Sequence, residues 1–254
     1  MQKVALITGA AGGLGQAMAE KLSAAGWQLV VTSRHAENLA NAYGHQHLQI
    51  AADCSTVAGA QHIMQVASAH NLTPIALAHC VGNIRLGALH RMSEVDFNDC
   101  MSANLFSAFH TLAAFVSGLR EMNMSGLREA KSAGVAVFVS SAAARIGTPN
   151  HEAVAAAKAG LEGLVRGAAA TYASQGIRIN AVAPGIMDTP ATSKILGSEM
   201  ARESAAKQYP MAGIGTADEL AELMLWLISD HAARVTGQVW SLDAGFASIR
   251  PLVK

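Results

Sequence analysis

The sequence predicts an α/β fold in which a doubly wound, seven-stranded parallel sheet carries helices on both faces. Strand-like and helix-like segments alternate from end to end, and most strand-like runs are continuously apolar, as expected for strands covered on both sides. A glycine-rich turn joins the first strand to the first helix. The 254 residues show no linker, repeat or low-complexity tract, so we expect 1–254 to form a single domain with an irregular lid at about 184–210.

The elements are expected in strict alternation along the chain. Val4–Ile7 is the first strand, and the helix from Gly13 to Ala25 should end at Gly26, because glycine suits a helix C-terminus. Ser55 and Ser93 precede helical patterns as candidate N-caps. The other strands are expected at 28–32, 48–50, 75–80, 135–139, 177–182 and 238–242, and the other helices at 36–43, 55–70, 93 to about 120, 149–174 and 218–229.

Composition excludes several classes of function. Eighteen basic residues balance eighteen acidic ones, which argues against a nucleic acid or an acidic membrane as partner. The three cysteines have no metal-ligand spacing, so we expect buried thiols in a reducing compartment and no metal site. No signal peptide is recognisable, and no apolar run reaches the length of a membrane span. The predicted location is the cytoplasm.

The turn after the first strand predicts a dinucleotide site. Thr8 and Gly9 open the pattern T-G-x-x-x-G-x-G, which Gly13 and Gly15 complete at the start of the first helix. Glycines let the backbone turn tightly and approach a pyrophosphate, whose negative charge the helix N-terminus favours. The alternative is a plain glycine turn.

The end of the second strand indicates which dinucleotide would bind. An acidic residue there would pair with the ribose 2′-hydroxyl of NAD, but this chain has Ser33 and Arg34 instead. A guanidinium can pair with a 2′-phosphate and a serine can add a hydrogen bond. NADP(H) is therefore favoured over NAD(H), while Arg34 as a solvated surface cation remains the alternative.

The segment from Ser141 to Lys158 resembles the catalytic stretch of the short-chain dehydrogenase/reductase family, and the 3-oxoacyl-carrier-protein reductase-like members in particular. That family has a Ser, a Tyr thirteen residues later and a Lys four residues after the Tyr; here the Tyr position holds Val154. The resemblance spans the whole chain. It implies a Rossmann-type fold and an oxidoreductase that moves a hydride between a nicotinamide cofactor and a carbonyl or alcohol.

The resemblance also implies roles for single residues. Ser141 would hold the carbonyl oxygen, Lys158 would bind the nicotinamide ribose, and Asn104 would support Lys158 through a water. Asp53 would lie near the adenine. The other residues assigned to the cofactor are Thr8, Gly9, Gly13, Leu14, Gly15, Ser33, Arg34, Cys54, Val81, Gly82, Pro184, Gly185, Ile186 and Thr189.

A valine has no proton to donate, so ordinary carbonyl reduction is expected to be slow unless another group replaces the tyrosine. His151 lies three residues before Val154, on the same face of the expected helix, and its imidazole titrates in a suitable range. Lys158 itself and Tyr209 are the other candidates. General acid catalysis is typically worth about 10²–10⁴ in rate.

Hypotheses from two classes remain open. One is an NADP(H)-dependent oxidoreductase acting on a small or acyl-thioester carbonyl with weakened proton donation. The other is a non-catalytic member that binds nucleotide or partners, or a variant trapped by a Tyr-to-Val substitution. His79 and Cys80 replace the two asparagines usual in the family, and His79 is expected to be structural. The Ala- and Gly-rich helix 153–170 and the low charge content, 14%, favour a homodimer or homotetramer, or pairing with an active relative.

Overall fold

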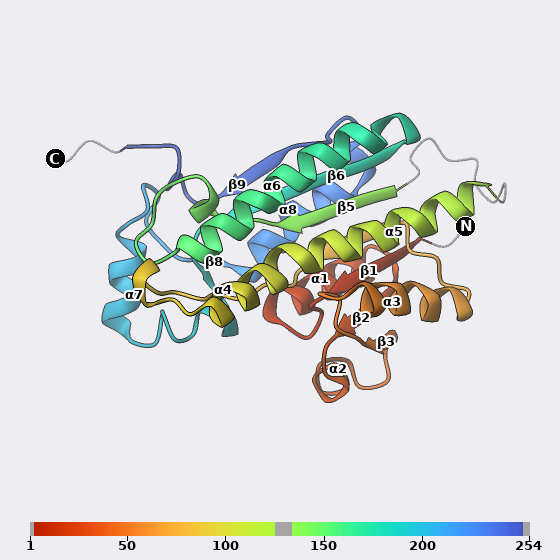
Figure 1. Cartoon of the computed structure of the whole chain (residues 1–254), viewed down its shortest axis with the longest axis horizontal. Coiled ribbons are helices and arrows are strands. Elements are labelled where there is room, and N and C mark those ends of the chain that lie inside the picture. The colour runs from red at the N-terminus through yellow and green to blue at the C-terminus, as the bar shows by residue number, and fades with distance from the viewer. Residues whose placement is uncertain (1–2, 125–133, 251–254) are drawn as a thin grey trace.

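The computed structural model describes residues 3–124 and 134–250, and these form a parallel sheet between two layers of helices (Figure 1). The strand order is β3-β2-β1-β4-β5-β6-β9, and every pairing is parallel. The predicted fold class is therefore confirmed. The strands are β1 (Val4–Thr8), β2 (Gln28–Ser33), β3 (Leu48–Ala51), β4 (Ala76–His79), β5 (Gly134–Val139), β6 (Ile177–Pro184) and β9 (Val239–Leu242).

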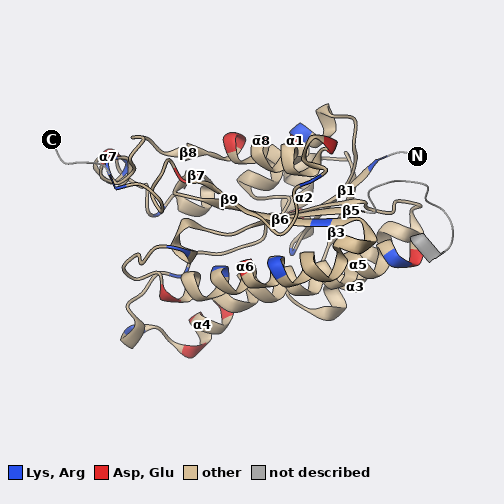
Figure 2. Cartoon of the chain, turned by 90° about the horizontal axis from the view of Figure 1, so that it is seen from above, with Lys and Arg blue, Asp and Glu red and all other residues tan. Residues whose placement is uncertain are grey.

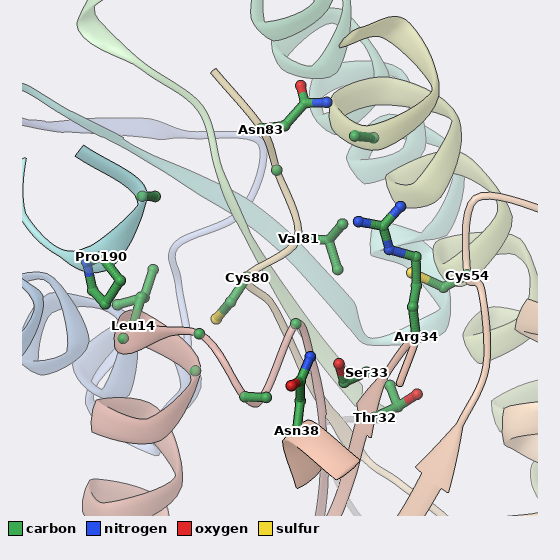
Figure 3. Close-up of a pocket in the computed structure, with 18 of the residues that line it drawn as sticks. Leu14, Thr32, Ser33, Arg34, Asn38, Cys54, Cys80, Val81, Asn83 and Pro190 are labelled. Atoms are coloured by element: carbon green, nitrogen blue, oxygen red, sulfur yellow. The ribbon is translucent and has the colours of Figure 1, made fainter. Parts of the chain in front are cut away.

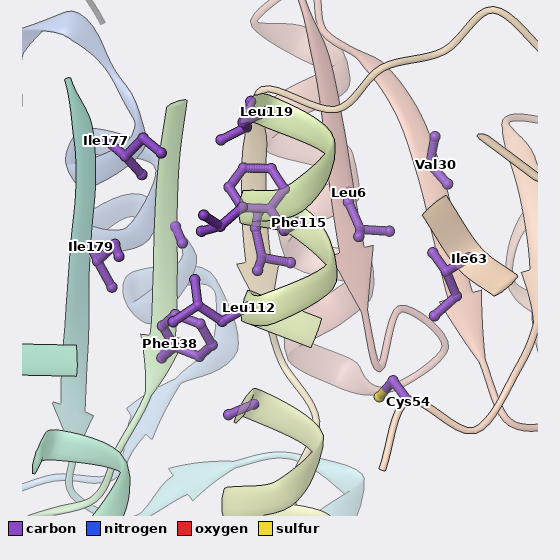
Figure 4. Packing of buried hydrophobic residues seen from close by; sticks show 14 of the residues in the cluster. Leu6, Val30, Cys54, Ile63, Leu112, Phe115, Leu119, Phe138, Ile177 and Ile179 are labelled. Carbon is purple, nitrogen blue, oxygen red and sulfur yellow. The ribbon is translucent and has the colours of Figure 1, made fainter. Parts of the chain in front are cut away.

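Both faces of the sheet are buried, which explains the unbroken apolar runs in the central strands. In β1, Leu6 packs with α3, α5 and α6, whereas Ile7 packs with α1 and α8 on the opposite face. Figure 2 shows the sheet edge-on between the two layers, and Figure 4 shows the α5 side, where Phe115 and Phe138 belong to one buried cluster. The helices are α1 (Gly13–Ala24), α2 (Ala36–Tyr43), α3 (Val57–Ala69), α5 (Ser107–Met124), α6 (Glu152–Tyr172) and α8 (Ala217–Ile228).

The long helix after β4 is continuous but not uniformly α-helical. Ser93 caps it by accepting a hydrogen bond from the Asp96 amide, as its position predicts. The helix runs through α4 (Glu94–Met101), a π-helical turn at Ser102–Phe106, and α5. Such π turns often mark functional positions, and this one contains Asn104.

One helix bears on the expectation that no apolar run reaches the length of a membrane span. The continuous helix Glu94–Met122 is long and apolar enough by length and composition. Its apolar residues serve another purpose here, because Leu112, Phe115 and Leu119 are buried against the sheet. A core helix of this kind satisfies the same test as a membrane helix.

Two helix starts differ from the sequence prediction. Helix α3 begins at Val57 and is capped by Thr56, whose hydroxyl accepts from the Gly59 amide; Ser55 instead donates to the Asp53 carboxylate. Helix α6 begins at Glu152, because 149–151 still belong to the preceding turn. Both positions offer several capping residues in a row, and the sequence alone does not select among them.

The segment predicted to be irregular contains short ordered pieces. The strand β7 (Met187–Asp188) pairs with β8 (Gly215–Thr216), and α7 (Glu199–Ala206) lies between them. A 3₁₀ turn at Pro190–Thr192 follows β7. The other 3₁₀ turns are Leu89–Arg91, Ala142–Ala144, Ala173–Gln175 and Asp230–Ala232.

Candidate functional site

A cavity of about 780 Å³ opens at the carboxyl ends of β1, β2, β3 and β4. Ligands of open α/β sheets bind at this edge, beside the point where the strand order reverses. Figure 3 shows the cavity between the glycine turn, the end of β2 and the loop after β4. Of the predicted residues, those lining it are Gly9, Gly13, Leu14, Gly15, Ser33, Arg34, Asp53, Cys54, Val81, Gly82 and Thr189.

The glycine turn is packed too closely for side chains. A Cβ on Gly15 would lie 2.4 Å from the Gly9 carbonyl oxygen, and one on Gly9 would lie 2.9 Å from the Cys80 carbonyl carbon. Gly9 also has a positive φ of 65°, which glycine adopts without strain. The turn is thus a bare backbone cradle that leads into the N-terminus of α1.

The irregular segment touches this cradle. A Cβ on Gly13 would lie 3.0 Å from Pro190 Cδ, so the 3₁₀ turn Pro190–Thr192 rests against the start of α1. Thr189, Pro190 and Ala191 accordingly line the cavity. Thr189, predicted from the lid segment, and the residues of the glycine turn therefore lie side by side in one site.

The end of β2 supplies the cation of the cavity. Arg34 is exposed, extends toward Cys54 in Figure 3, and forms no ion pair within residues 3–124 and 134–250. Asn38 and Asn41 of α2 line the same end. Sequence reasoning missed these two asparagines, although their spacing of three residues places both on one face of a helix that starts directly after Arg34.

Asp53 lies in the cavity wall after β3. Its Oδ1 accepts hydrogen bonds from the Ser55 amide at 2.9 Å and the Ser55 hydroxyl at 2.7 Å. Cys54 is buried next to it, and desolvation raises the pKa of its thiol to about 11. The three cysteine thiols are free, and only Cys80 among them is partly accessible.

His79 holds three elements together, as expected of a structural residue. Ser107 donates its proton to the Ala103 carbonyl, so His79 Nε2 must donate to Ser107 Oγ at 3.1 Å, and Nδ1 accepts from Thr8 Oγ1 at 2.8 Å. Burial lowers the pKa of this imidazole to about 3. Thr8, predicted to contact the cofactor, does not line the cavity because its side chain is buried in this contact.

Lys158 and Asn104 lie behind the cavity wall at Gly82. A Cβ on Gly82 would lie 2.8 Å from Asn104 Oδ1 and 3.3 Å from Lys158 Nζ, so both atoms approach the same point. Lys158 donates to the Val139 carbonyl at 2.7 Å. Desolvation lowers the pKa of Lys158 to about 8, which the thiols of Cys100 and Cys80 partly oppose.

Ser141 and Val154 flank this lysine from two elements. Ser141 follows β5, and its Oγ accepts from the Ala143 amide at 3.1 Å. Val154 is 5% exposed and packs with Cys100, Ala153 and the partly buried Phe97. The position four residues before Lys158 is therefore filled by a small apolar cluster.

Besides Lys158, the two other candidate substitutes for a proton donor are placed differently. His151 precedes α6, and its Nδ1 lies 2.8 Å from the Pro149 carbonyl, which leaves Nε2 without a protein partner among the described residues. The hydroxyl of Tyr209 accepts from the Ile186 amide at 2.7 Å, and its ring covers Gly185. Tyr209 is thus fixed against the segment that the resemblance assigned to the nicotinamide.

The remaining predicted residues do not line the cavity itself. Those are Asn104, Ser141, His151, Lys158, Pro184, Gly185 and Ile186. Conversely, Asn83 and Asp99 line it and were missed. The signal for Asn83 was its place directly after Gly82, in a loop that follows a strand; the helical position of Asp99 gave no such signal.

Comparison with known proteins identifies the family. A family model described as enoyl-(acyl carrier protein) reductase matches residues 9–247. The chain is 33% identical over 253 residues to the 3-oxoacyl-[acyl-carrier-protein] reductase FabG of Pseudomonas aeruginosa, with 96% of each chain covered. It is 31% identical over 265 residues to cis-4-hydroxycyclohexanecarboxylate dehydrogenase of Sinomonas cyclohexanicum, with 98% of each covered.

Solved structures of dehydrogenases and reductases have the same fold as this chain over nearly its whole length. The structure of ElxO with NADP bound superposes with a TM-score of 0.86 at 25% sequence identity, covering 98% of this chain and all of that one. A gluconate dehydrogenase structure from Agrobacterium tumefaciens has a TM-score of 0.88 at 23% identity, which is a likeness of fold alone. Fold, glycine turn and relatives agree: the chain belongs to the short-chain dehydrogenase/reductase family of oxidoreductases.

Proposed function

We propose that the protein is an NADP(H)-dependent oxidoreductase for a carbonyl or alcohol substrate, with weakened proton donation because Val154 occupies the position of the family's tyrosine. Val154, four residues before Lys158, lies in an apolar cluster with Cys100. The observation that carries the proposal is the retention of Ser141, Lys158 and Asn104, the last two of which approach one point at Gly82. A protein that only binds nucleotide has no need of all three.

The cavity fits the proposed cofactor. The cradle of Gly9, Gly13 and Gly15 at the N-terminus of α1 suits a pyrophosphate, since any Cβ at Gly15 would collide with backbone. Arg34 and Ser33 would hold a 2′-phosphate, with Asn38 beside them. The ElxO structure is described as having NADP bound, which is consistent with this choice.

Asp53, next to Cys54 at the Arg34 end of the cavity, would lie at the adenine. Lys158, behind the cavity wall at Gly82, would hold the nicotinamide ribose. The cofactor supplies or accepts a hydride at its nicotinamide ring when bound. Ser141 Oγ keeps its own proton while accepting from Ala143, so it can donate to a carbonyl oxygen. Reduction also requires a proton at that oxygen, and Val154 cannot deliver it.

We propose His151 as the substitute acid, because its Nε2 is unpartnered among the described residues while Nδ1 faces Pro149. Lys158 is the competing donor, since a pKa of about 8 leaves it largely protonated at neutral pH yet acidic enough to give up a proton. Tyr209 is the weakest candidate, because its hydroxyl is held at Ile186.

The test is NADPH binding and single-turnover hydride transfer on a panel of ketones and acyl thioesters. We expect tight NADPH binding with slow turnover, and loss of the residual rate in His151→Ala. Loss of the rate in His151→Ala with NADPH binding unchanged would support the histidine. If the rate survives His151→Ala but falls in Lys158→Met at unchanged NADPH saturation, the lysine is the donor.

The alternative function is a non-catalytic member that binds nucleotide or an active relative. The replacement of the paired asparagines by His79 and Cys80 favours it, as does the missing hydroxyl at Val154. Binding of NADPH with no hydride transfer to any substrate of the panel, even over hours, would establish this alternative.

Substrate class, assembly and location belong to the same proposal. The reductase relatives named for acyl carrier protein favour an acyl-thioester carbonyl. Phe106 and Phe109 are about half exposed on the long helix, and Gly163 and Gly167 of α6 face open space, which favours a homodimer or homotetramer through these helices. We propose one cytoplasmic domain of 1–254 with a lid at about 184–210, and sedimentation analysis tests the assembly.

A further inference from the structure

A chain of polar side chains runs from the rim of the cavity to Asn104. Arg85 donates to Asp99 Oδ2 at 2.9 Å from Nε and 2.6 Å from Nη2. Asn83 Nδ2 donates to the same carboxylate oxygen at 2.9 Å. Asn83 Oδ1 in turn accepts from Asn104 Nδ2 at 2.9 Å. None of these contacts except the Asn104 end follows from the family resemblance.

The Asp99 carboxylate fixes the orientation of the two amide groups in this series of hydrogen bonds. An ionised carboxylate can only accept, so the amide group of Asn83 must turn its NH₂ toward Asp99 and its oxygen toward Asn104. Asn104 must then turn its own NH₂ toward Asn83, whose carbonyl oxygen also accepts at 3.1 Å. The second proton of that NH₂ goes to the Cys100 carbonyl at 2.9 Å.

The series of hydrogen bonds ends at an acceptor with no partner, the side-chain oxygen of Asn104. Asn104 Oδ1 is buried and has no hydrogen-bond partner within the described part of the chain. It lies 2.8 Å from the position that a Cβ on Gly82 would occupy, and Lys158 Nζ lies 3.3 Å from the same position. An orphaned buried oxygen costs stability unless a donor or a water meets it, and the nearest cation is the Lys158 ammonium.

The loop after β4 gives Asn83 its importance. Residues 80–88 contain no regular secondary structure, so the backbone offers no ladder of hydrogen bonds to hold Asn83 in place. Its side chain, together with that of Arg85, joins the loop to α4 through Asp99, and two of the acceptors around the Asn104 NH₂ belong to Asn83.

We propose that Asn83 is a positioning residue: anchored by Asp99 and Arg85, it holds Asn104 so that the free Oδ1 faces Lys158 across Gly82. The proposal deepens the proposed function, on which it rests, because Lys158 is the group assigned to the nicotinamide ribose. It adds a polar link from the exposed rim of the cavity to the buried lysine.

The measured quantity is the pKa of Lys158 in the cofactor-free protein. It is obtained by NMR titration of lysine side chains labelled with ¹³C, and Lys158→Met assigns the signal. Burial sets this pKa at about 8, and the titratable groups around the ammonium are His79 and Cys80 from β4 and the loop, and Cys100 from α4. None of these groups is altered in the variants below.

Asn83→Leu keeps the size of the side chain but removes both hydrogen-bonding ends. We expect it to lower the Lys158 pKa by about half a unit or more, because the ammonium loses an oriented acceptor. Asp99→Leu should lower it in the same direction, whereas Asp99→Asn, which can still accept from Asn83, should restore most of the native value. Asn41→Leu, at the far end of the same cavity, is the matched control.

A second measurement compares the binding of NADPH with the binding of its adenosine half alone. Asn83→Leu should weaken binding of NADPH about three- to tenfold, yet leave binding of adenosine 2′,5′-bisphosphate, which lacks both the nicotinamide and its ribose, unchanged. If thermal unfolding shows that Asn83→Leu is folded and the pKa of Lys158 is nevertheless unchanged, the positioning role of Asn83 is overturned. Failure of NADPH to bind wild-type protein would instead refute the proposed function and leave the pKa comparison valid.

Discussion

The two ends of the cavity are built on opposite principles. At the glycine turn, the site is backbone held in one conformation by close packing, because no Cβ fits at Gly9 or Gly15. At the lysine end, the site consists of side chains joined by hydrogen bonds, with one acceptor, Asn104 Oδ1, left unused. Of the residues at which the sequence departs from the expected family pattern, Val154 lies one helical turn before Lys158, Cys80 borders the glycine turn at Gly9, and His79 links β1 to the long helix. Backbone geometry tolerates no substitution, whereas side-chain chemistry can be replaced piece by piece.

The largest expected effect comes from restoring a hydroxyl at the lysine end. Val154→Tyr should raise single-turnover hydride transfer by about 10²–10⁴, with a smaller change in KM, because the hydroxyl acts mainly in the transition state. Val154 packs with Cys100, so the larger ring needs room, and Cys100→Ala is made alongside.

Val154→Phe with Cys100→Ala is the matched control, since it supplies the ring without the proton. Equal rates for the Tyr and Phe variants would mean that packing, not proton donation, limits the wild-type enzyme.

The next largest effect is on the free energy of unfolding, which should depend on pH through His79. His79 is neutral in the folded protein down to about pH 3, whereas in the unfolded chain it binds a proton near pH 6.5. Below pH 6.5 the unfolded state therefore holds more protons, and the free energy of unfolding falls as the pH drops toward 3, by up to about 4 kcal/mol. His79→Gln should show a shallower loss between pH 6.5 and 4 by urea unfolding. Parallel curves for the two proteins would contradict the buried neutral imidazole.

A pair of glycine substitutions tests the packed end directly. Gly15→Ala places a Cβ 2.4 Å from the Gly9 oxygen and should cost about 1–3 kcal/mol of unfolding free energy, as well as nucleotide binding. Gly163→Ala, in the middle of α6 with open space around it, should stabilise the monomer by about 0.5–1 kcal/mol. Thermal unfolding of both variants gives the comparison, and equal shifts would show that the glycine turn can relax.

A further effect is expected at the end of β2, where Arg34 lines the cavity. Arg34→Ala should weaken NADPH binding by about ten- to hundredfold and leave NADH binding nearly unchanged, because only the 2′-phosphate needs the guanidinium. Calorimetry with both nucleotides measures the difference. Equal affinity of the wild-type protein for NADPH and NADH would show that Arg34 is a solvated cation.

The pattern of residues along the chain was sufficient for the fold and for the packed end of the site. Continuous apolar strands, the spacing of Gly9, Gly13 and Gly15, and Arg34 at the end of β2 all act through neighbours in sequence or through periodicity. The structure confirms the fold and places these four residues along one cavity, while their binding of a cofactor stays a prediction. The N-cap of α3 was missed because Ser55 and Thr56 are chemically equivalent capping residues.

Only the tertiary structure decided how distant side chains pair. The contact of Thr8 with His79 exists because β1 and β4 are adjacent in the sheet. The contact of Tyr209 with Ile186 exists because the end of the lid segment folds back on its own start, directly after β6. Asn83 meets Asp99 and Asn104 for the same reason: a loop without its own backbone pairing lies on a π turn of the long helix. Periodicity records which face of an element is buried, but hydrogen bonds between elements depend on strand order and loop path, which no local pattern contains.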